Sequence, residues 1–292
     1  MSSFQAVIMG IVQGLTEFLP VSSSGHLAVI KGLFGVETDG GVLFEVLLHV
    51  ATLAAVFAVY YKDVIKILVD FGGICRDASV NTVRFFKNIS AINRQEYLPI
   101  CTTPHRKFVV MLIISTIPTG IMGILLNDVV EVVSGNLLVV GLCLIGTGGI
   151  LFVSDLIENG NKKQKEAHFG DALIAGISQG FAVLPGISRS GTTITACLLC
   201  GFDRRFAVKY SFIMSMPAIL GALIVELIKL PGSGGGTSAP AGACVIAMIL
   251  AAVIGYFALK LVNALAVNRK FKPFWIYCLI VGAISIIVFL VK

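Results

Sequence analysis

Six apolar segments, each long enough to cross a lipid bilayer as a helix, constrain this chain more than any other feature of its sequence. A helix needs about 20 mostly apolar residues to cross a hydrocarbon core of roughly 30 Å. The segments are Val42–Tyr61, Phe108–Leu126, Leu137–Val153, Phe206–Ile228, Ala243–Leu265 and Phe274–Val291. Of the 292 residues, 57% are hydrophobic and only 13% are charged. The sequence therefore predicts an all-α integral membrane protein with six transmembrane helices.

The positive charge of the chain is distributed unevenly between its connections. The net charge is +6, with 22 Lys and Arg against 16 Asp and Glu. Basic residues follow the first and third segments, precede the fourth, and lie between the fifth and sixth, whereas connections 127–136 and 229–242 contain only Lys229. This alternation places the basic connections in the cytoplasm and both termini outside. The charge is thus topological, and we expect no nucleic-acid partner. Because no Lys or Arg precedes Lys31, we expect residues 1–30 to stay in the mature chain.

Two further apolar stretches, 4–34 and 171–203, are interrupted near their middles by Pro and Gly. Their halves are too short to cross a bilayer: Val7–Leu19 and Leu27–Phe34 in the first, Ala172–Leu184 and Thr193–Phe202 in the second. Non-helical backbone is tolerated at membrane depth when protein buries it or when it lines a cavity. Each stretch is therefore predicted to be a re-entrant helical hairpin.

The two stretches also resemble each other. "AVIMGIVQG" at 6–14 aligns with "ALIAGISQG" at 172–180, and a Leu-Pro and a Ser-rich turn follow both. A hairpin and three spans in each copy make the second copy enter from the opposite face, as in many transporters. We expect a single membrane domain, 1–292, with an inverted repeat of about 1–156 and about 170–292. Chance similarity is the alternative, because Gly and Ala are frequent in membrane helices.

The turns of both hairpins carry hydroxyl groups suited to binding an anion. After Pro20 come Ser22, Ser23 and Ser24, and after Pro185 come Ser188, Ser190, Thr192 and Thr193. Two helix N-termini would converge from opposite faces, each with free N–H groups and a positive dipole end. Arg189 lies in the second turn, and its planar fork of donors suits phosphate oxygens. The alternative for Arg189 is a structural ion pair with Glu17 or Glu45.

Acidic and imidazole groups complete the candidate site. Glu17 lies four residues after Gln13, so their oxygens share one helix face and could hold a divalent cation, Mg²⁺ or Ca²⁺, together with phosphate and water. Two ligands alone are a weak metal signal. His26 follows the Ser-rich turn and is a candidate to move a proton, the alternative being a hydrogen-bonded core residue. His49 and Glu45 are either supporting groups or a helix-packing pair.

"QGLTEFLPVSSSGH" at 13–26 and "LPGISRSGTT" at 184–193 resemble the two signature motifs of the bacterial undecaprenyl-diphosphate phosphatases, the bacitracin-resistance family. The resemblance extends over essentially the whole chain. It implies re-entrant helices in an inverted repeat and dephosphorylation of the C55 lipid carrier of cell-wall synthesis. It also implies a place in the bacterial plasma membrane, with the active site facing outward.

Carried over position by position, the family's acidic residue or Gln falls on Gln13 and its Glu four residues later on Glu17. Its first hydroxyl and imidazole fall on Ser23 and His26. The phosphate-binding positions of the second motif fall on Ser188, Arg189 and Thr193. Many members have Glu where this chain has Gln13, which removes a charge and weakens the expectation of a cation at that position. Ser22, Ser24 and Ser190 complete the predicted phosphate-binding set.

Two mechanisms and one rival function remain open from the sequence. Ser23, deprotonated by His26, attacks the terminal phosphorus, or His26 activates water while Ser23 only binds. The rival is a transporter or flippase for a polyprenyl phosphate or another anion, which needs the same anion site without the nucleophile. A homodimer is compatible with these features. The basic stretch 62–107 is either an interfacial amphipathic helix or a solvated connector.

Overall fold

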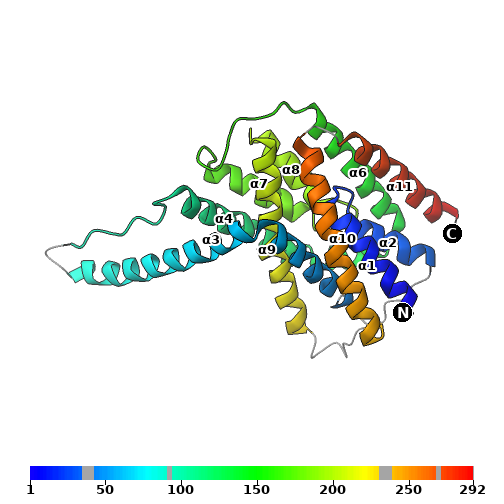
Figure 1. Cartoon of the computed structure of the whole chain (residues 1–292), viewed down its shortest axis with the longest axis horizontal. Coiled ribbons are helices and arrows are strands. Elements are labelled where there is room, and N and C mark those ends of the chain that lie inside the picture. The colour runs from blue at the N-terminus through cyan, green and yellow to red at the C-terminus, as the bar shows by residue number, and fades with distance from the viewer. Residues whose placement is uncertain (35–42, 91–93, 230–238, 268–270, 292) are drawn as a thin grey trace.

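The computed structural model describes residues 1–34, 43–90, 94–229, 239–267 and 271–291. Within these ranges the chain forms eleven α-helices, and the only β-type pairing is an isolated bridge between Lys162 and Phe202. The predicted all-α class is confirmed. In chain order the helices are α1 Ser3–Phe18, α2 Ser23–Phe34, α3 Leu43–Ser90, α4 Pro104–Leu125, α5 Asn127–Ser134, α6 Leu137–Leu156, α7 Phe169–Phe181, α8 Arg189–Leu199, α9 Arg204–Lys229, α10 Ala241–Val267 and α11 Lys272–Val291 (Figure 1).

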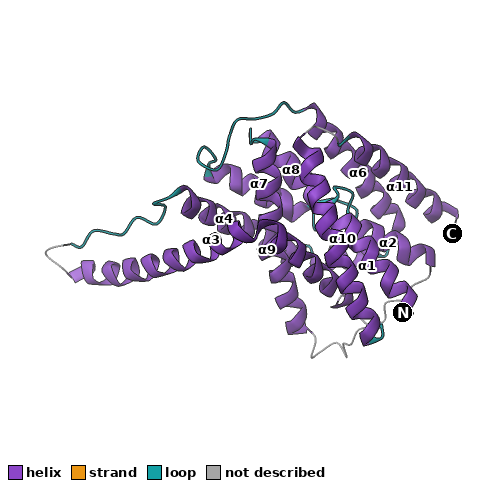
Figure 2. Ribbon diagram, viewed as in Figure 1, coloured by secondary structure: helices purple, strands orange, loops and turns teal. Residues whose placement is uncertain are grey.

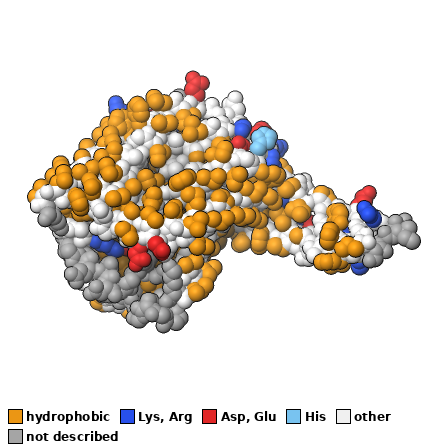
Figure 3. Space-filling model, turned by 180° about the vertical axis from the view of Figure 1, so that it is seen from behind, with side chains coloured by type: hydrophobic (Ala, Val, Ile, Leu, Met, Phe, Trp, Pro, Cys, Tyr) orange, Lys and Arg blue, Asp and Glu red, His pale blue; other side chains and the backbone are white. Residues whose placement is uncertain are grey.

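Six of these helices are long and apolar enough to cross a membrane: α3, α4, α6, α9, α10 and α11. They correspond one to one with the six apolar segments expected from the sequence. Large apolar side chains cover the face of the molecule seen in Figure 3, with few charged groups among them. A water-soluble protein would not expose so continuous an apolar surface. The chain is therefore a multi-pass membrane protein.

Four helices are shorter and fall in the two interrupted stretches. With 16 and 12 residues in α1 and α2, and 13 and 11 in α7 and α8, each is shorter than a hydrocarbon core of roughly 30 Å at about 1.5 Å per residue. A capping box between Ser2 and Gln5 starts α1, and α1 ends just before Pro20, which cannot continue a helix. Residues 182–188 join α7 to α8.

The short helices pack on spans from the other half of the chain. Helix α1 lies along α10, and α7 lies along α4. Glycine is required at both contacts: a Cβ at Gly10 would lie 2.5 Å from the Ala247 carbonyl oxygen, and one at Gly176 would lie 2.3 Å from that of Ser115. Helices α3 and α9 also pack together, as do α6 and α11. These pairings bring the ends of α1 and α7 into the interior of the bundle.

The buried core anchors the end of α1 where the site forms. Phe18, the last residue of α1, packs edge-on against Phe212 of α9 with ring centroids 5.6 Å apart. Both belong to the largest buried apolar cluster, together with Tyr210, whose hydroxyl bonds to Ser115 of α4. Burying such aromatic side chains contributes about 2 kcal/mol each. The preceding residue, Glu17, is thereby held in a fixed position.

Helix α3 differs from the sequence expectation. The first span was expected to end at Tyr61, but the helix continues through the basic stretch to Ser90, with one non-helical residue at Tyr60 (φ −112°, ψ 23°). Of the two alternatives for 62–107, a helix is therefore confirmed over its first part, 62–90. Apolar and basic side chains at helical spacing suit a helix whether or not lipid surrounds it. Helix α5 was not anticipated.

Candidate active site

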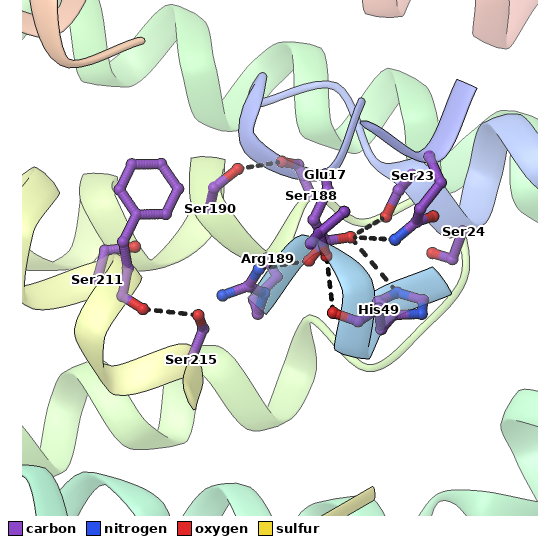
Figure 4. Close-up of polar contacts among 12 residues, drawn as sticks. Glu17, Ser23, Ser24, His49, Ser188, Arg189, Ser190, Ser211 and Ser215 are labelled. Atoms are coloured by element: carbon purple, nitrogen blue, oxygen red, sulfur yellow. Dashed lines mark hydrogen bonds and ion pairs between the residues drawn. The ribbon is translucent and has the colours of Figure 1, made fainter. Parts of the chain in front are cut away.

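Glu17 is the centre of a buried polar cluster formed at the turns between α1 and α2 and between α7 and α8 (Figure 4). Its side chain is 3% exposed, at the end of α1. One carboxylate oxygen, Oε1, accepts from Arg189 Nη2 at 2.6 Å. The other, Oε2, accepts from Ser23 Oγ at 2.7 Å and from Gln13 Nε2 at 2.8 Å. These donors compensate the removal of the carboxylate from water, which would otherwise be very unfavourable.

The first turn places Ser23 by a sharp reversal of the chain after Pro20. Ser22 has a φ of +70°, a left-handed conformation that is unusual for a residue other than glycine. Ser22 Oγ accepts the backbone N–H of Gly25 at 3.2 Å. Helix α2 therefore starts at Ser23, whose hydroxyl points back to Glu17.

The second turn places Arg189 in a corresponding way. Gly186 has a φ of +96°, and Thr147 Oγ1 of α6 donates to its carbonyl at 2.8 Å while accepting the Ser188 N–H at 2.9 Å. Ser188 Oγ caps the next helix by accepting the Gly191 N–H at 3.1 Å. Arg189 is thus the first residue of α8, as Ser23 is of α2.

The two turns face a shared pocket. Its polar lining comes from both turns and from neighbouring spans: Thr16, Glu17, Ser22, Ser23, Ser24, Glu45, His49, Thr119, Gln179, Ser188 and Arg189. Its apolar lining includes Val46 of α3 and Ala218, Ile219 and Ala222 of α9. Two helix N-termini bring their positive dipole ends to the pocket beside Arg189, opposite the carboxylates of Glu17 and Glu45. The arrangement suits an anionic group attached to an apolar chain.

Arg189 is both paired and available. The ion pair with Glu17, one of the two alternatives expected from the sequence, is present. Its other terminal nitrogen, Nη1, is buried and has no hydrogen-bond partner among the residues that the structure describes. A buried donor without a partner is unfavourable by about 1–3 kcal/mol. An anion in the pocket could accept from this donor without breaking the ion pair.

The two candidate histidines lie in different surroundings. His26 Nδ1 bonds to the Ser22 carbonyl at 2.7 Å, and Nε2 bonds to the Tyr277 hydroxyl at 2.8 Å. Since a carbonyl only accepts, Nδ1 carries a proton, and in a neutral imidazole Nε2 accepts from the Tyr277 O–H. His26 does not line the pocket in this structure. His49 does, with Nε2 3.4 Å from Glu17 Oε2.

The remaining predicted residues divide into two groups. Ser24 lines the pocket with Ser22, their hydroxyl oxygens 3.4 Å apart. Ser190 is buried beside Ser188, again at 3.4 Å. Thr193 points away along α8, where its Oγ1 donates to the Arg189 carbonyl at 2.8 Å and lies 2.5 Å from Ser211 Oγ. Direct phosphate binding by Ser190 and Thr193 stays a prediction.

Sequence reasoning did not assign three polar pocket residues, Thr16, Thr119 and Gln179. Gln179 donates through Nε2 to Thr119 Oγ1 at 3.2 Å, and its Oε1 is buried without a hydrogen-bond partner in the described part of the chain. The signal was present, because Gln179 aligns with Gln13 in the repeated "AVIMGIVQG" and "ALIAGISQG" stretches. Thr119 carried no such signal, since an isolated Thr in an apolar span usually bonds only its own helix.

The predicted cation ligands offer a partial site. Gln13 donates its amide N–H to Glu17 and leaves Oε1 buried without a partner in the structure as described. No group of three or more His, Cys, Asp or Glu suited to a metal occurs in the described ranges. One carboxylate and one amide oxygen fit a cation that takes most of its ligands from phosphate and water, as Mg²⁺ does.

Comparison with known proteins gives consistent matches over nearly the entire chain. Residues 6–284 match the family model described as bacitracin resistance protein BacA. A protein of Methanosphaera stadtmanae named undecaprenyl-diphosphatase is 37% identical over 97% of this chain and 96% of its own length. Proteins of the same name from Halothermothrix orenii and Treponema denticola are each 39% identical, covering 98% and 97% of this chain and 98% and 96% of their own lengths.

Proposed function

Because this chain belongs to the BacA family of bacitracin resistance proteins, we propose that it is an undecaprenyl-diphosphatase. It hydrolyses undecaprenyl diphosphate to undecaprenyl phosphate and inorganic phosphate, which returns the lipid carrier to cell-wall synthesis and confers bacitracin resistance. The observation in the structure that best supports this activity is Arg189, a half-buried side chain at a helix N-terminus whose buried Nη1 has no hydrogen-bond partner among the described residues. A phosphate oxygen can accept from this donor.

The finer architecture that we propose is two re-entrant hairpins, 4–34 and 171–203, in an inverted repeat of about 1–156 and about 170–292. Exchanged packing supports it: the first hairpin's α1 lies on α10 of the second half, while α7 lies on α4 of the first. The aligned Gly10 and Gly176 make the close approaches in both contacts. The turns Ser22–Gly25 and Ser188–Gly191 repeat the same side-chain-to-backbone bond.

We propose that the pocket opens to the outer face. The basic connections place the N-terminal end of α3 and the C-terminal ends of α4 and α9 outside. The pocket residues of these spans lie toward those ends: Glu45 and His49 in α3, Thr119 in α4, and Ala222 in α9. Substrate therefore reaches the turns from the outer leaflet, and its polyprenyl tail passes along the apolar wall made by α3 and α9.

Binding of the diphosphate uses the polar half of the pocket. Arg189 holds phosphate oxygens through Nη1 and the free edge of its guanidinium. Ser22, Ser24 and Ser188 supply hydroxyls, and the N-termini of α2 and α8 supply N–H groups and their positive dipole ends. Ser190 and Thr193 support Arg189 from α8. This fixed set of donors stabilises negative charge as it develops on the transferred phosphoryl group.

Ser23 is the proposed nucleophile. Its Oγ attacks the terminal phosphorus, the bond from that phosphorus to the bridging oxygen breaks, and undecaprenyl phosphate leaves with that oxygen. The Ser23 proton passes to Glu17 Oε2, which already accepts it at 2.7 Å. Water then attacks the phosphoserine, releases inorganic phosphate and restores the Ser23 hydroxyl.

His26 takes part in one of two ways that remain proposals. As a base for Ser23 or for water, it would first have to exchange its bond to Tyr277 for one to the reacting group. As a positioning residue, it holds the first turn through the Ser22 carbonyl at 2.7 Å. The direct Ser23–Glu17 bond makes Glu17 the nearer proton acceptor for the nucleophile in this geometry.

We also propose that a divalent cation, Mg²⁺ or Ca²⁺, binds together with the substrate. Glu17 and the free Gln13 Oε1 would hold it, with diphosphate oxygens and water as the other ligands. The cation would supply positive charge against the diphosphate oxygens. Because the protein alone offers few ligands, Ca²⁺ affinity in calorimetry should be weak without lipid and rise when an undecaprenyl diphosphate analogue is present.

The test of the function is release of inorganic phosphate from undecaprenyl diphosphate by the purified protein in detergent. We expect release that EDTA suppresses and that Arg189→Ala abolishes, while Arg205→Ala, an exposed arginine at the start of α9, has no effect. No release by a folded preparation would contradict the phosphatase and favour a carrier, which would then be measured as lipid movement between leaflets of proteoliposomes.

A further inference from the structure

The part of α3 beyond its kink, with the segment that returns along it, forms a structure that the catalytic site does not use. We call residues 62–90 and 94–103 the arm. Helix α3 has 48 residues and would measure about 72 Å at about 1.5 Å per residue, more than twice a hydrocarbon core. The helix changes direction at Tyr60, where the backbone is not helical, and the arm begins just beyond this kink. Figure 1 shows it leaving the bundle sideways, across the direction of α9.

The returning segment runs beside the arm helix (Figure 2) and is attached to it by matched hydrogen bonds. The side-chain amide of Asn88 bonds both backbone groups of Gln95, at 2.9 and 2.8 Å, and that of Asn81 bonds both groups of Leu98, at 2.8 and 2.7 Å. Seven helical residues rise about 10.5 Å, and three extended residues span about 10 Å. Because these two lengths match, both Asn side chains can pair with the returning segment at once, which fixes its register along the arm helix.

Further contacts extend the attachment along the arm. Arg84 Nη1 donates to the Glu96 carbonyl at 2.5 Å, and Arg106 Nη1 donates to Asp77 Oδ2 at 2.6 Å. Asp77 and Asn88 are buried although the arm projects from the body. The returning segment thus covers one face of the arm helix along most of its length, and the arm is an ordered element.

The opposite face of the arm helix is apolar and exposed. Leu68 and Phe86 lie on it, at spacings that place them away from Asp77, Asn81 and Asn88. Leu68 is 61% exposed and Phe86 65%. The same side also carries Ile65, Phe71, Val83 and Ile89, all exposed. Figure 3 shows apolar side chains on the arm running on from those of the membrane-facing body.

Exposed basic side chains also lie on the arm helix, Arg76 and Lys87 at the border of the apolar face and Lys62 and Lys66 further round the helix. Two of the arm's acidic groups are already paired inside the protein: Asp63 accepts from Lys209 at 2.6 Å, and Asp77 accepts from Arg76 and Arg106. The charge left to a partner is therefore positive. A helix with an apolar face and adjacent basic residues is suited to the surface of an anionic membrane.

We propose that the arm is an interfacial anchor: its apolar face lies in the cytoplasmic leaflet, and its basic side chains bind anionic phospholipid headgroups. The helix enters the arm directly from a span, and the positive connections place this end of the span on the cytoplasmic side. A second copy of the chain is a poorer partner, because two such faces would bring like charges together. The returning segment faces the cytosol.

The chain's single Trp makes the test direct. In a Trp275→Phe background, a new Trp is placed on the apolar face by Phe86→Trp or on the returning segment by the matched control Tyr97→Trp, a 53% exposed aromatic. Each protein is reconstituted in vesicles containing brominated phosphatidylglycerol or brominated phosphatidylcholine, and quenching of the Trp emission is measured. Both changes replace exposed aromatic side chains, so the fold should be retained.

We expect position 86 to be quenched at least about twofold more than position 97, and more by phosphatidylglycerol than by phosphatidylcholine. Replacing Lys62, Lys66, Arg76 and Lys87 by Gln should remove the preference for phosphatidylglycerol. Equal quenching at the two positions would overturn the proposal. So would emission at position 86 that depends on the protein-to-lipid ratio and resists brominated lipid, because a second copy would then cover the face.

Discussion

The turn between α1 and α2 and the turn between α7 and α8 make the same side-chain-to-backbone hydrogen bond but carry different chemical groups. In both, a serine hydroxyl accepts the N–H of a glycine three residues on, at 3.2 Å for Ser22 and 3.1 Å for Ser188. The next residue opens the following helix, and there the turns diverge: Ser23 in the first, Arg189 in the second. The same position after the capping serine therefore holds a nucleophile candidate in the first turn and a phosphate-binding arginine in the second.

The preceding helices diverge in a complementary way. Gln13 and Gln179 correspond, but four residues later the first helix has Glu17 and the second chain segment has Val183. A buried carboxylate or guanidinium alone would be strongly destabilising, whereas the two together form a hydrogen-bonded pair. Glu17 and Arg189 satisfy each other at 2.6 Å across the junction of the turns. The active site consequently requires both helix pairs, α1–α2 and α7–α8, because neither could bury its charged residue without the other.

The first test of the difference between the two turns removes Ser23, the nucleophile candidate that only the first turn has. We expect Ser23→Ala to lower kcat on the order of 10⁵-fold, because the remaining catalytic groups accelerate the reaction little once the nucleophile is absent. Ser24→Ala, in the same turn and the same pocket, should lose no more than about tenfold. Phosphate release gives the rates, and rapid quenching with labelled substrate should trap a phosphoenzyme that Ser23→Ala lacks. Full turnover by Ser23→Ala would exclude the serine and favour attack by water.

The second test separates the charge pair. Arg189→Gln and Glu17→Gln should each lower kcat/KM by about 10³-fold, because each removes charge from the site of phosphoryl transfer. Each single change also leaves a buried charge unpaired, which should destabilise the protein by about 3 kcal/mol, while the double variant should recover part of that loss. Thermal unfolding in detergent gives the comparison, with Arg205→Gln as the control. Additive losses of stability in the double variant would mean that the pair is not coupled.

Much of this arrangement follows from the sequence, and the exceptions have physical causes. The six spans follow from apolar length, since nothing else in a protein requires about 20 apolar residues in a row. The two turns follow from Pro20 and Pro185 inside otherwise apolar stretches. The end of α3 did not follow, because basic residues mark where a segment leaves the membrane but do not end a helix. Ser90 could only be located by the structure.

Contacts between residues on different helices could also not be predicted from the sequence. Ser23 and Glu17 are six residues apart on two helices, and only the left-handed Ser22 turns one toward the other. His26 was expected near the reacting hydroxyl from its spacing, whereas its Nε2 bonds to Tyr277, 251 residues away. Its catalytic role stays a prediction. Gln179 was within reach, because the repeat had already aligned it with Gln13.

The third test asks whether His26, which follows the first turn, accepts the proton of the Ser23 hydroxyl. If His26 takes the proton, His26→Gln should lower kcat by about 100-fold and remove one limb of the pH profile of kcat. His49→Gln, which removes a weaker contact of 3.4 Å to Glu17, should lower kcat by about tenfold with the pH profile unchanged. If His26 only positions the turn, Tyr277→Phe should reproduce the loss of His26→Gln. A larger loss of kcat in His49→Gln than in His26→Gln would indicate that His49, and not His26, accepts the proton.

The smallest expected effect concerns the backbone φ angle of the capping serine, which differs between the two turns. Ser22 has a φ of +70° and Ser188 a φ of −75°, although both accept from a glycine N–H. Glycine replaces serine at a helix cap with a loss of only a few tenths of a kcal/mol, but it relieves left-handed strain of about 1 kcal/mol. Ser22→Gly should therefore stabilise the protein by about 0.5 kcal/mol, and Ser188→Gly should destabilise it by a similar amount. Denaturant unfolding in detergent compares the two directly. A loss at Ser22 as large as that at Ser188 would show that the hydroxyl, through its bond to Gly25, outweighs the conformation that places Ser23 beside Glu17.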